Sequence, residues 1–285
     1  MKGTIYKGVG GFYYVMTGSG IVECKARGRF RREHITPMIG DNVEIDVRNG
    51  KGSITDIYPR RSRLIRPAVA NIDTIVVVAA AKSPDPNTAV IDKMLVNAEI
   101  NGIEPIVCIN KSELAECDDL ISLYEHAGYK AIKTSAETGF GIDALRKQIQ
   151  GKTAAFAGVS GVGKSSLLTI ITGSSLETGT VSDKISRGRH TTRHVELFPV
   201  EGGGYVLDTP GFSSIEPENI TPQELADCFP EMREAKGGCR FRGCAHINEP
   251  DCAVKALVRK GEIAESRYES YKELYELQRS RNTWK

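Results

Sequence analysis

Short runs of alternating apolar and polar residues fill the first part of the chain. Val43, Ile45 and Val47 alternate with acidic side chains, a period of two that is typical of a strand with one buried face. Similar segments separated by glycine lie at residues 12–15, 21–25, 42–47 and 53–57. Several short strands in a small region predict a closed five-stranded OB-type barrel over residues 1–62, a fold that commonly binds oligonucleotides.

From residue 63 onward, apolar strands alternate with helical patterns. Strands are expected at residues 74–80, 106–109, 131–134, 154–157, 195–199 and 205–207, and helices at residues 89–100, 143–149 and from Lys164 onward. Continuous apolar strands alternating with helices are typical of a parallel sheet covered on both faces. The sequence therefore predicts an α/β domain over residues 63–214, joined to the barrel by an arginine-rich linker at residues 60–67.

A phosphate-binding loop is indicated where a predicted strand meets a helix. Residues 158–165 read GVSGVGKS and fit G-x-x-x-x-G-K-[ST], a loop whose backbone N–H groups wrap a phosphate. Lys164 is expected to reach the β and γ phosphates and to act in catalysis, and Ser165 to bind Mg²⁺. The residues assigned to nucleotide binding here are Gly158, Val159, Ser160, Gly161, Val162, Gly163, Lys164, Ser165 and Ser166.

Two further strand ends carry motifs that look like the guanine-specificity motifs of GTPases, N-K-x-D and S-A. The first consists of Asn110, Lys111, Ser112 and Glu113, and the second contains Ser135 and Ala136. In GTPases the acid accepts hydrogen bonds from guanine and the alanine amide donates to its carbonyl oxygen. Glu113 is one methylene longer than the usual aspartate, so the match to the guanine-specificity motif is incomplete. A P-loop ATPase or a kinase that acts on a small molecule therefore remains an alternative function.

A third strand end carries D-x-x-G, with Asp208 as a Mg²⁺ ligand and Gly211 as the γ-phosphate sensor. Phe212 follows, where Ras-like enzymes place a water-orienting glutamine. Residues 173–193 are rich in Ser, Thr and Gly and are interpreted as switch I. Within this loop Thr192, or failing it Thr191, is the expected Mg²⁺ ligand.

A histidine in the same loop can replace the absent glutamine. His190 has the chemistry to orient or deprotonate water near neutral pH, and His194 is the second choice. Because arginines surround His190, contact with RNA phosphate is the alternative role. A non-catalytic, nucleotide-gated RNA-binding module therefore remains a second hypothesis.

The order of these motifs indicates circular permutation. The base-reading motifs at residues 110 and 134 precede the phosphate loop at residue 158, and switch I and D-x-x-G follow it. Permutation is tolerated when the original termini are close together. Its consequence is that D-x-x-G runs directly into a third domain, at residues 215–285, which we expect to change its pose when GTP is hydrolysed.

Four soft ligands lie within one short segment of this mostly helical third domain. Cys239, Cys244, His246 and Cys252 form a Cys₃His set, which is typical of a closed structural zinc site. Tyr268, Tyr271 and Tyr275 recur at helical spacing and are expected to pack onto the metal-binding loop, with RNA stacking as the alternative.

Composition and charge change this picture in two ways. Residues 1–70 contain 13 Lys and Arg against 6 Asp and Glu, so the positive charge gathers on the barrel and favours a polyanionic partner. Seven cysteines, three of them in the last fifth of the chain, argue for a reduced compartment with a metal site. Because the longest apolar run, residues 75–81, is too short to span a membrane, we expect a cytoplasmic protein without membrane association.

Taken together, the permuted motifs, the OB-like barrel and the Cys-Cys-His-Cys finger resemble the ribosome small subunit-dependent GTPase A family over nearly the whole chain. The resemblance implies a circularly permuted P-loop GTPase domain flanked by the barrel and a zinc domain. It implies GTP hydrolysis to GDP, stimulated by the small (30S) ribosomal subunit during its late maturation, with contacts to 16S rRNA. By the same resemblance, His190 is the catalytic histidine, Zn²⁺ is structural and Mg²⁺ accompanies GTP. We expect a monomer.

Overall fold

The computed structural model describes residues 1–48, 50–65, 67–173, 195–209, 212, 217 and 220–282. Contacts within the chain divide it into two units. Unit 1 comprises Met1–Thr74, Arg146–Phe156 and Lys164–Pro210, and unit 2 comprises Ile75–Leu145, Ala157–Gly163 and Gly211–Lys285.

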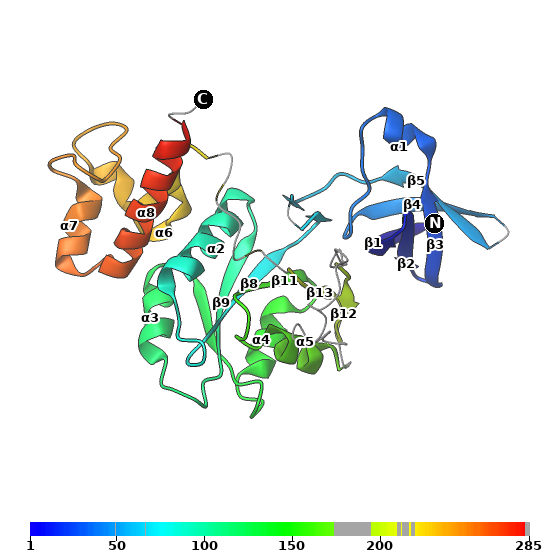
Figure 1. Cartoon of the computed structure of the whole chain (residues 1–285), viewed down its shortest axis with the longest axis horizontal. Helices are drawn as coiled ribbons and strands as arrows, with labels where there is room; N and C mark the ends of the chain where they lie inside the picture. The colour runs from blue at the N-terminus through cyan, green and yellow to red at the C-terminus, as the bar shows by residue number, and fades with distance from the viewer. Residues whose placement is uncertain are drawn as a thin grey trace, which may run out of the picture. The chain divides into compact units, whose positions relative to one another are not determined.

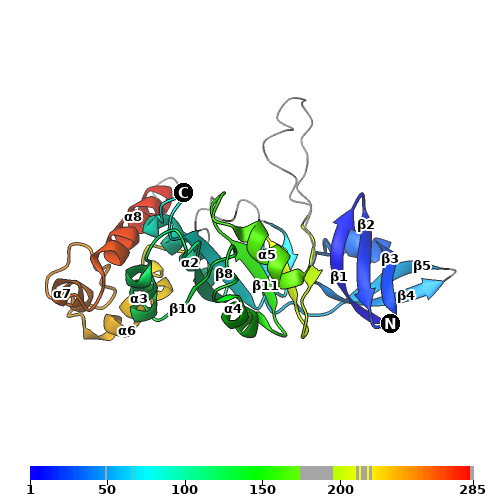
Figure 2. The same cartoon turned by 90° about the horizontal axis from the view of Figure 1, so that it is seen from below.

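The predicted five-stranded barrel is confirmed in unit 1 (Figures 1 and 2). Its strand order is β1-β2-β3-β5-β4, with α1 (Gly28–Arg32) inserted before β4. The strands are β1 (Lys2–Val9), β2 (Phe12–Thr17), β3 (Gly20–Ala26), β4 (Asn42–Arg48) and β5 (Lys51–Ile57). Apolar residues at alternate positions, among them Ile5, Val15 and Ile54, are fully buried in the barrel core, as the period of two predicts.

The segment predicted to be a linker is instead built into unit 1. β6 (Arg63–Leu64) pairs with β7 (Val69–Ala70) in an antiparallel ladder. Arg60 donates from Nε to Oδ1 of the fully buried Asp41 at 2.6 Å and from Nη2 to Oδ2 at 2.7 Å. This bidentate pair neutralises a buried carboxylate, and its partners lie too far apart in the sequence for the arginine-rich composition to reveal it.

The α/β domain contains a six-stranded sheet of order β10-β9-β8-β11-β13-β12. Its strands are β8 (Thr74–Ala80), β9 (Glu104–Asn110), β10 (Lys130–Lys133), β11 (Thr153–Ala157), β12 (Phe198–Pro199) and β13 (Tyr205–Asp208). β10 runs parallel to β9 and β13 parallel to β11, whereas the edge strand β12 runs antiparallel to β13. The expectation of a parallel sheet is therefore confirmed for the β9–β10 and β11–β13 pairs and wrong at the β12 edge, where a short turn joins β12 to β13.

Four helices accompany this sheet: α2 (Thr88–Ile100), α3 (Asp118–His126), α4 (Ile142–Ile149) and α5 (Lys164–Thr172). The sequence pattern predicts three of them and misses α3. α3 has 9 residues, and only Tyr124 is buried on it. Its apolar positions therefore span too short a window for a helical period to be read from the sequence.

Short helices surround the metal-binding loop in the C-terminal part of unit 2. The 3-10 turns are η2 (Leu225–Cys228) and η3 (Lys236–Gly238), and the α-helices are α6 (Pro230–Ala235), α7 (Ala253–Lys260) and α8 (Glu265–Asn282). α7 ends at Gly261, which takes a left-handed conformation with φ +76°. None of the helices described is long and apolar enough to cross a membrane.

A buried cluster of charges joins α8 to α2, which lie side by side within unit 2 (Figure 1). Arg267 of α8 is 1% exposed and donates to Asp92 of α2 at 2.7 Å and to Glu231 of α6 at 2.8 Å. Asp92 also accepts a hydrogen bond from Tyr124 at 3.1 Å. Because charges removed from water are tolerated only when they are paired, this cluster fixes the C-terminal helix to the α/β domain.

Arg267→Ala is expected to lower the free energy of unfolding by about 3–5 kcal/mol, since it leaves two carboxylates buried without their cation. Urea denaturation followed by circular dichroism measures this loss. Lys130→Ala, which breaks the exposed ion pair with Glu104, is the control and should cost less than about 1 kcal/mol. Equal losses in the two variants would contradict the role given to Arg267.

Candidate nucleotide site and metal site

Asn110, at the carboxyl end of β9, links two of the predicted motifs within unit 2. Its buried side-chain amide donates to the carbonyl oxygen of Val162 in the phosphate loop at 2.9 Å. Its Oδ1 accepts from the backbone amide of Ala136 at 3.1 Å and from the hydroxyl of Thr134 at 3.3 Å. One side chain therefore forms hydrogen bonds to both the phosphate loop and the S-A loop and links the two loops.

The phosphate loop approaches this side chain so closely that only glycine fits. Gly163 has φ +92°, and a Cβ atom there would lie 2.3 Å from Asn110 Nδ2. The motif's second invariant glycine thus serves packing as well as phosphate access. Lys111 contacts a different loop, the one that follows β8, since its amine donates to the carbonyl oxygen of Ser83.

The other residues predicted to read the base lie on the loops that follow β9 and β10. The backbone amide of Ser112 donates to Thr134 O at 3.1 Å, and the hydroxyl of Ser135 accepts from the amide of Thr138 at 3.0 Å. Glu113 is exposed. In this structure the amide of Ala136 donates to Asn110, so its donation to a guanine carbonyl stays a prediction.

Unit 1 carries the predicted phosphate and magnesium residues Lys164, Ser165 and Asp208. Lys164 and Ser165 open α5, whereas Asp208 ends β13, which pairs with β11 in the register Phe156↔Asp208. Burial lowers the pKa of Lys164, and the carboxylate of Asp208 opposes this shift. An ammonium with few waters around it is well suited to an anionic ligand. Carboxylate and hydroxyl oxygens are the donors that Mg²⁺ prefers.

Several predicted residues lie outside the described residues. They are His190, Thr191, Thr192, His194 and Gly211, so their roles stay predictions. Phe212 is described and is only 2% exposed. A buried phenyl ring cannot orient a water molecule, which agrees with the expectation that the usual catalytic glutamine has no equivalent at this position.

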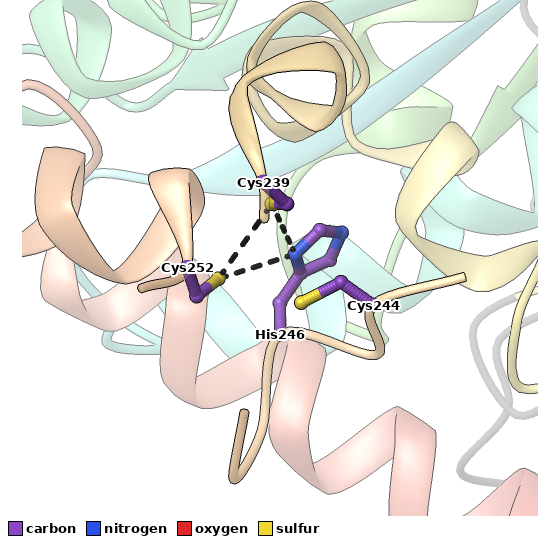
Figure 3. A group of neighbouring side chains, drawn as sticks. All are labelled: Cys239, Cys244, His246 and Cys252. Carbon is purple, nitrogen blue, oxygen red and sulfur yellow. Dashed lines mark hydrogen bonds between the residues drawn. The ribbon is translucent and has the colours of Figure 1, made fainter. Parts of the chain in front are cut away.

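The four predicted metal ligands lie together in unit 2 (Figure 3). The Nδ1 atom of His246 is 3.5 Å from Cys239 Sγ and 3.3 Å from Cys252 Sγ, the two sulfur atoms are 4.0 Å apart, and all four ligand atoms, Cys244 Sγ included, lie within 4.8 Å of one another. Zinc bonds of about 2.3 Å to sulfur and 2.0–2.1 Å to nitrogen place tetrahedral ligands about 3.5–3.8 Å apart. The separations in the cluster are close to these values, and the group could hold a single tetrahedral ion.

The pKa shifts of the ligand side chains also suit a bound metal ion. Burial raises the pKa of the Cys244 thiol to about 12 and lowers the pKa of His246. The neutral imidazole is the form that binds metal, whereas a buried thiol ionises only beside a positive charge. A divalent cation supplies that charge, so the donor set suits a resident ion.

The loop that carries these ligands is held by residues that the sequence analysis did not assign. Glu249 accepts hydrogen bonds from the amides of Ala245 at 2.7 Å and Ile247 at 3.1 Å. The spacing of Glu249 from Ala245 and Ile247 matches no motif used in the sequence analysis, and no hydrophobic or charge pattern singles out Glu249. The tyrosines of α8 do have such a signal, namely their helical spacing.

Tyr268 and Tyr271 pack onto the loop as predicted. Tyr268 donates to the carbonyl oxygen of His246 and Tyr271 to that of Ala245, each at 2.6 Å. Tyr271 is fully buried, and Tyr275 packs against the same apolar cluster. The packing interpretation of these rings is thus confirmed.

Comparison with known proteins agrees with this arrangement. Residues 57–218 match the family described as RsgA GTPase, and residues 2–54 match the RsgA N-terminal domain. The small ribosomal subunit biogenesis GTPase RsgA of Caldanaerobacter subterraneus is 49% identical over 95% of this chain and 93% of its own length. The corresponding protein of Agathobacter rectalis is 43% identical over the full length of both chains.

Two solved structures are also similar over nearly the whole chain. YjeQ from Thermotoga maritima superposes with a TM-score of 0.82 at 39% identity, over 97% of this chain and 98% of its own. YloQ, described as a circularly permuted GTPase, superposes with a TM-score of 0.81 at 38% identity, over 98% of this chain and 95% of its own.

Asn110→Ala is expected to raise the Kd for a fluorescent GDP analogue at least about tenfold, because it leaves buried partners in two loops without their hydrogen bonds. Fluorescence titration measures this change. Asn101→Ala is the matched control, since the side-chain amide of Asn101 donates to Asn97 O at the end of α2 and touches neither loop in the contacts described. Equal affinities for the two variants would contradict the role of Asn110.

Cys252→Ala is expected to reduce the bound metal from about one ion per chain to near zero and to lower the melting temperature. Mass spectrometry of the metal content and thermal denaturation measure both effects. Cys228→Ala, which alters a buried cysteine of the same apolar cluster outside the ligand group, should keep its metal. Full metal content in the Cys252 variant would show that the cluster is not the binding site.

Proposed function

The chain belongs to the RsgA family of small ribosomal subunit biogenesis GTPases, and from this premise we propose that the small (30S) subunit stimulates its hydrolysis of GTP to GDP and phosphate. The reaction acts in late maturation of that subunit, with the barrel and the C-terminal domain bound to 16S rRNA. The protein works as a cytoplasmic monomer.

The observation that carries this proposal is the junction at Asn110. A side chain that bonds to both Val162 and Ala136 fixes the distance between a base-reading loop and a phosphate loop. That geometry suits a ligand with a purine base and a polyphosphate, held at both ends. The N-K-S-E and S-A motifs around it favour guanine.

In the proposed mechanism, charge neutralisation and positioning supply most of the rate. Lys164 contacts the β and γ phosphates, helped by the N-terminus of α5. Ser165, Thr192 and Asp208 would hold Mg²⁺, which would supply positive charge against the charge that develops on the phosphates. His190 orients the attacking water. Because Phe212 replaces the usual glutamine, the free protein turns over slowly.

The proposed resident ion of the C-terminal domain is Zn²⁺, bound by Cys239, Cys244, His246 and Cys252. Its chemistry is structural, since four protein ligands leave no open position for substrate. In the proposal it fixes the shape of the loop that faces ribosomal RNA.

Exposed cations on the barrel support RNA as the partner. Arg31 and Arg32 of α1 are exposed, and the ammonium of Lys25 lies 4.6 Å from the centre of the Phe12 ring. Cations beside accessible rings suit phosphate contact and base stacking. Phe30, by contrast, is 3% exposed and fills the barrel, so it is not part of this surface.

Purified small subunits are expected to raise the GTP turnover of this protein severalfold, measured by phosphate release. Raising monovalent salt from about 50 to 200 mM should abolish most of the stimulation, because contacts to RNA phosphates release counterions. The basal turnover should change little. Arg31→Glu with Arg32→Glu should weaken stimulation without changing basal turnover. A turnover rate that is unaffected by subunits would overturn the proposed function.

A further inference from the structure

The barrel strand β1 has an irregular edge within unit 1. β1 pairs with β4 over Lys2 to Thr4, and its register with β2 shifts between Ile5 and Lys7. This shift is a β-bulge at Tyr6. Bulges redirect backbone groups away from the regular ladder, so the edge beyond the bulge is available to another segment.

The chain just before β12 occupies that edge. Leu197 donates its backbone amide to the carbonyl oxygen of Tyr6 at 2.9 Å, and Lys7 forms an antiparallel bridge with Glu196. The side chains of Lys7 and Glu196 make an ion pair of 2.8 Å and are 34% and 27% exposed. The hydrogen bond to Glu196 raises the pKa of Lys7, so the ammonium of Lys7 keeps its charge at neutral pH.

A second contact joins the barrel strand β2, the neighbour of β1, to β13. The hydroxyl of Tyr205 on β13 donates to Met16 Sδ of β2 at 3.4 Å. Leu197 itself is 1% exposed. A backbone hydrogen bond, an ion pair and a side-chain hydrogen bond therefore hold the barrel against the β12–β13 hairpin and the residues just before it. This is more than an isolated surface ion pair provides.

The hairpin leads directly to a proposed magnesium ligand. Phe198 pairs with Val206, and three positions after Tyr205 the strand ends at Asp208. Beyond it, the amide and the hydroxyl of Thr209 both donate to Phe156 O, at 3.1 Å and 2.9 Å. Asp208 therefore ends a short strand that pairs with β11 along its whole length and contacts the barrel through Tyr205 at its start.

We propose that Lys7 and Glu196 are positioning residues for the magnesium side of the nucleotide site. The bulged edge of β1 holds Glu196 and Leu197, these set the β12–β13 hairpin, and the hairpin sets the carboxylate of Asp208. A polyanion that binds the barrel then acts on the metal site through this contact. The inference rests on the proposed function, because it assigns a regulatory route to the same nucleotide site.

A charge-swap cycle tests the proposal on the full chain, using the release of a fluorescent GDP analogue as the readout. Lys7→Glu and Glu196→Lys each place like charges together and are expected to raise the Mg²⁺ concentration for half-maximal slowing of release by about threefold to tenfold. The double swap restores the ion pair and should return this midpoint to within about twofold of wild type. Lys7→Arg should leave it unchanged.

Two further measurements separate positioning from general damage. GDP affinity without Mg²⁺ should be the same in all variants, because the base-reading loops belong to unit 2 and are not altered. Arg48→Asp, which breaks the exposed barrel ion pair with Asp46, should leave the Mg²⁺ midpoint unchanged. Melting temperatures confirm that each variant is folded.

Unchanged midpoints in the single variants, or a double swap that fails to restore the midpoint, would overturn the positioning role while leaving the proposed function intact. Wild-type protein that binds no GDP would overturn the proposed function, and this inference with it. The two failures are therefore distinguishable in the same experiment.

Discussion

The nucleotide site depends on the buried side-chain amide of Asn110. Its hydrogen bonds reach the phosphate loop at Val162 and the S-A loop at Ala136, two loops that follow different strands. An amide buried at 1% exposure must satisfy its donors and its acceptor. A movement of one loop away from the other would therefore break a hydrogen bond of this buried amide, which favours one separation of the two ends of the proposed site.

The same principle, a buried polar group with partners from distant segments, joins the C-terminal domain to the α/β domain. Arg267 and Asp92 are 175 positions apart and form a pair that excludes water almost completely. The sequence places this domain directly after D-x-x-G, which suggests that the domain moves when that motif moves. The structure adds a second connection through α2, so any change of pose on hydrolysis has to work against a buried charge cluster.

Most of the architecture could be predicted, because each strand, loop motif and ligand set is determined by residues close together in the sequence. The alternation in Val43, Ile45 and Val47 follows from the pleat of one strand, and the G-K-S run lies where strand and helix must meet. The four metal ligands could be predicted because they belong to one short loop. What could not be predicted depends on distant partners: nothing in the sequence near Arg60 reveals Asp41, and nothing near Arg267 reveals Asp92. The bulge at Tyr6 leaves no pattern in composition at all.

The central claim is that loops joined by Asn110 select a guanine nucleotide although Glu113 replaces the usual aspartate. Calorimetric titration of the wild-type protein with GDP and with ADP, at fixed Mg²⁺ and salt, tests it most directly. A site whose polar groups match guanine leaves them unpaired with adenine. We therefore expect GDP to bind at least about 100-fold more tightly than ADP. Equal affinities for the two nucleotides would contradict the account.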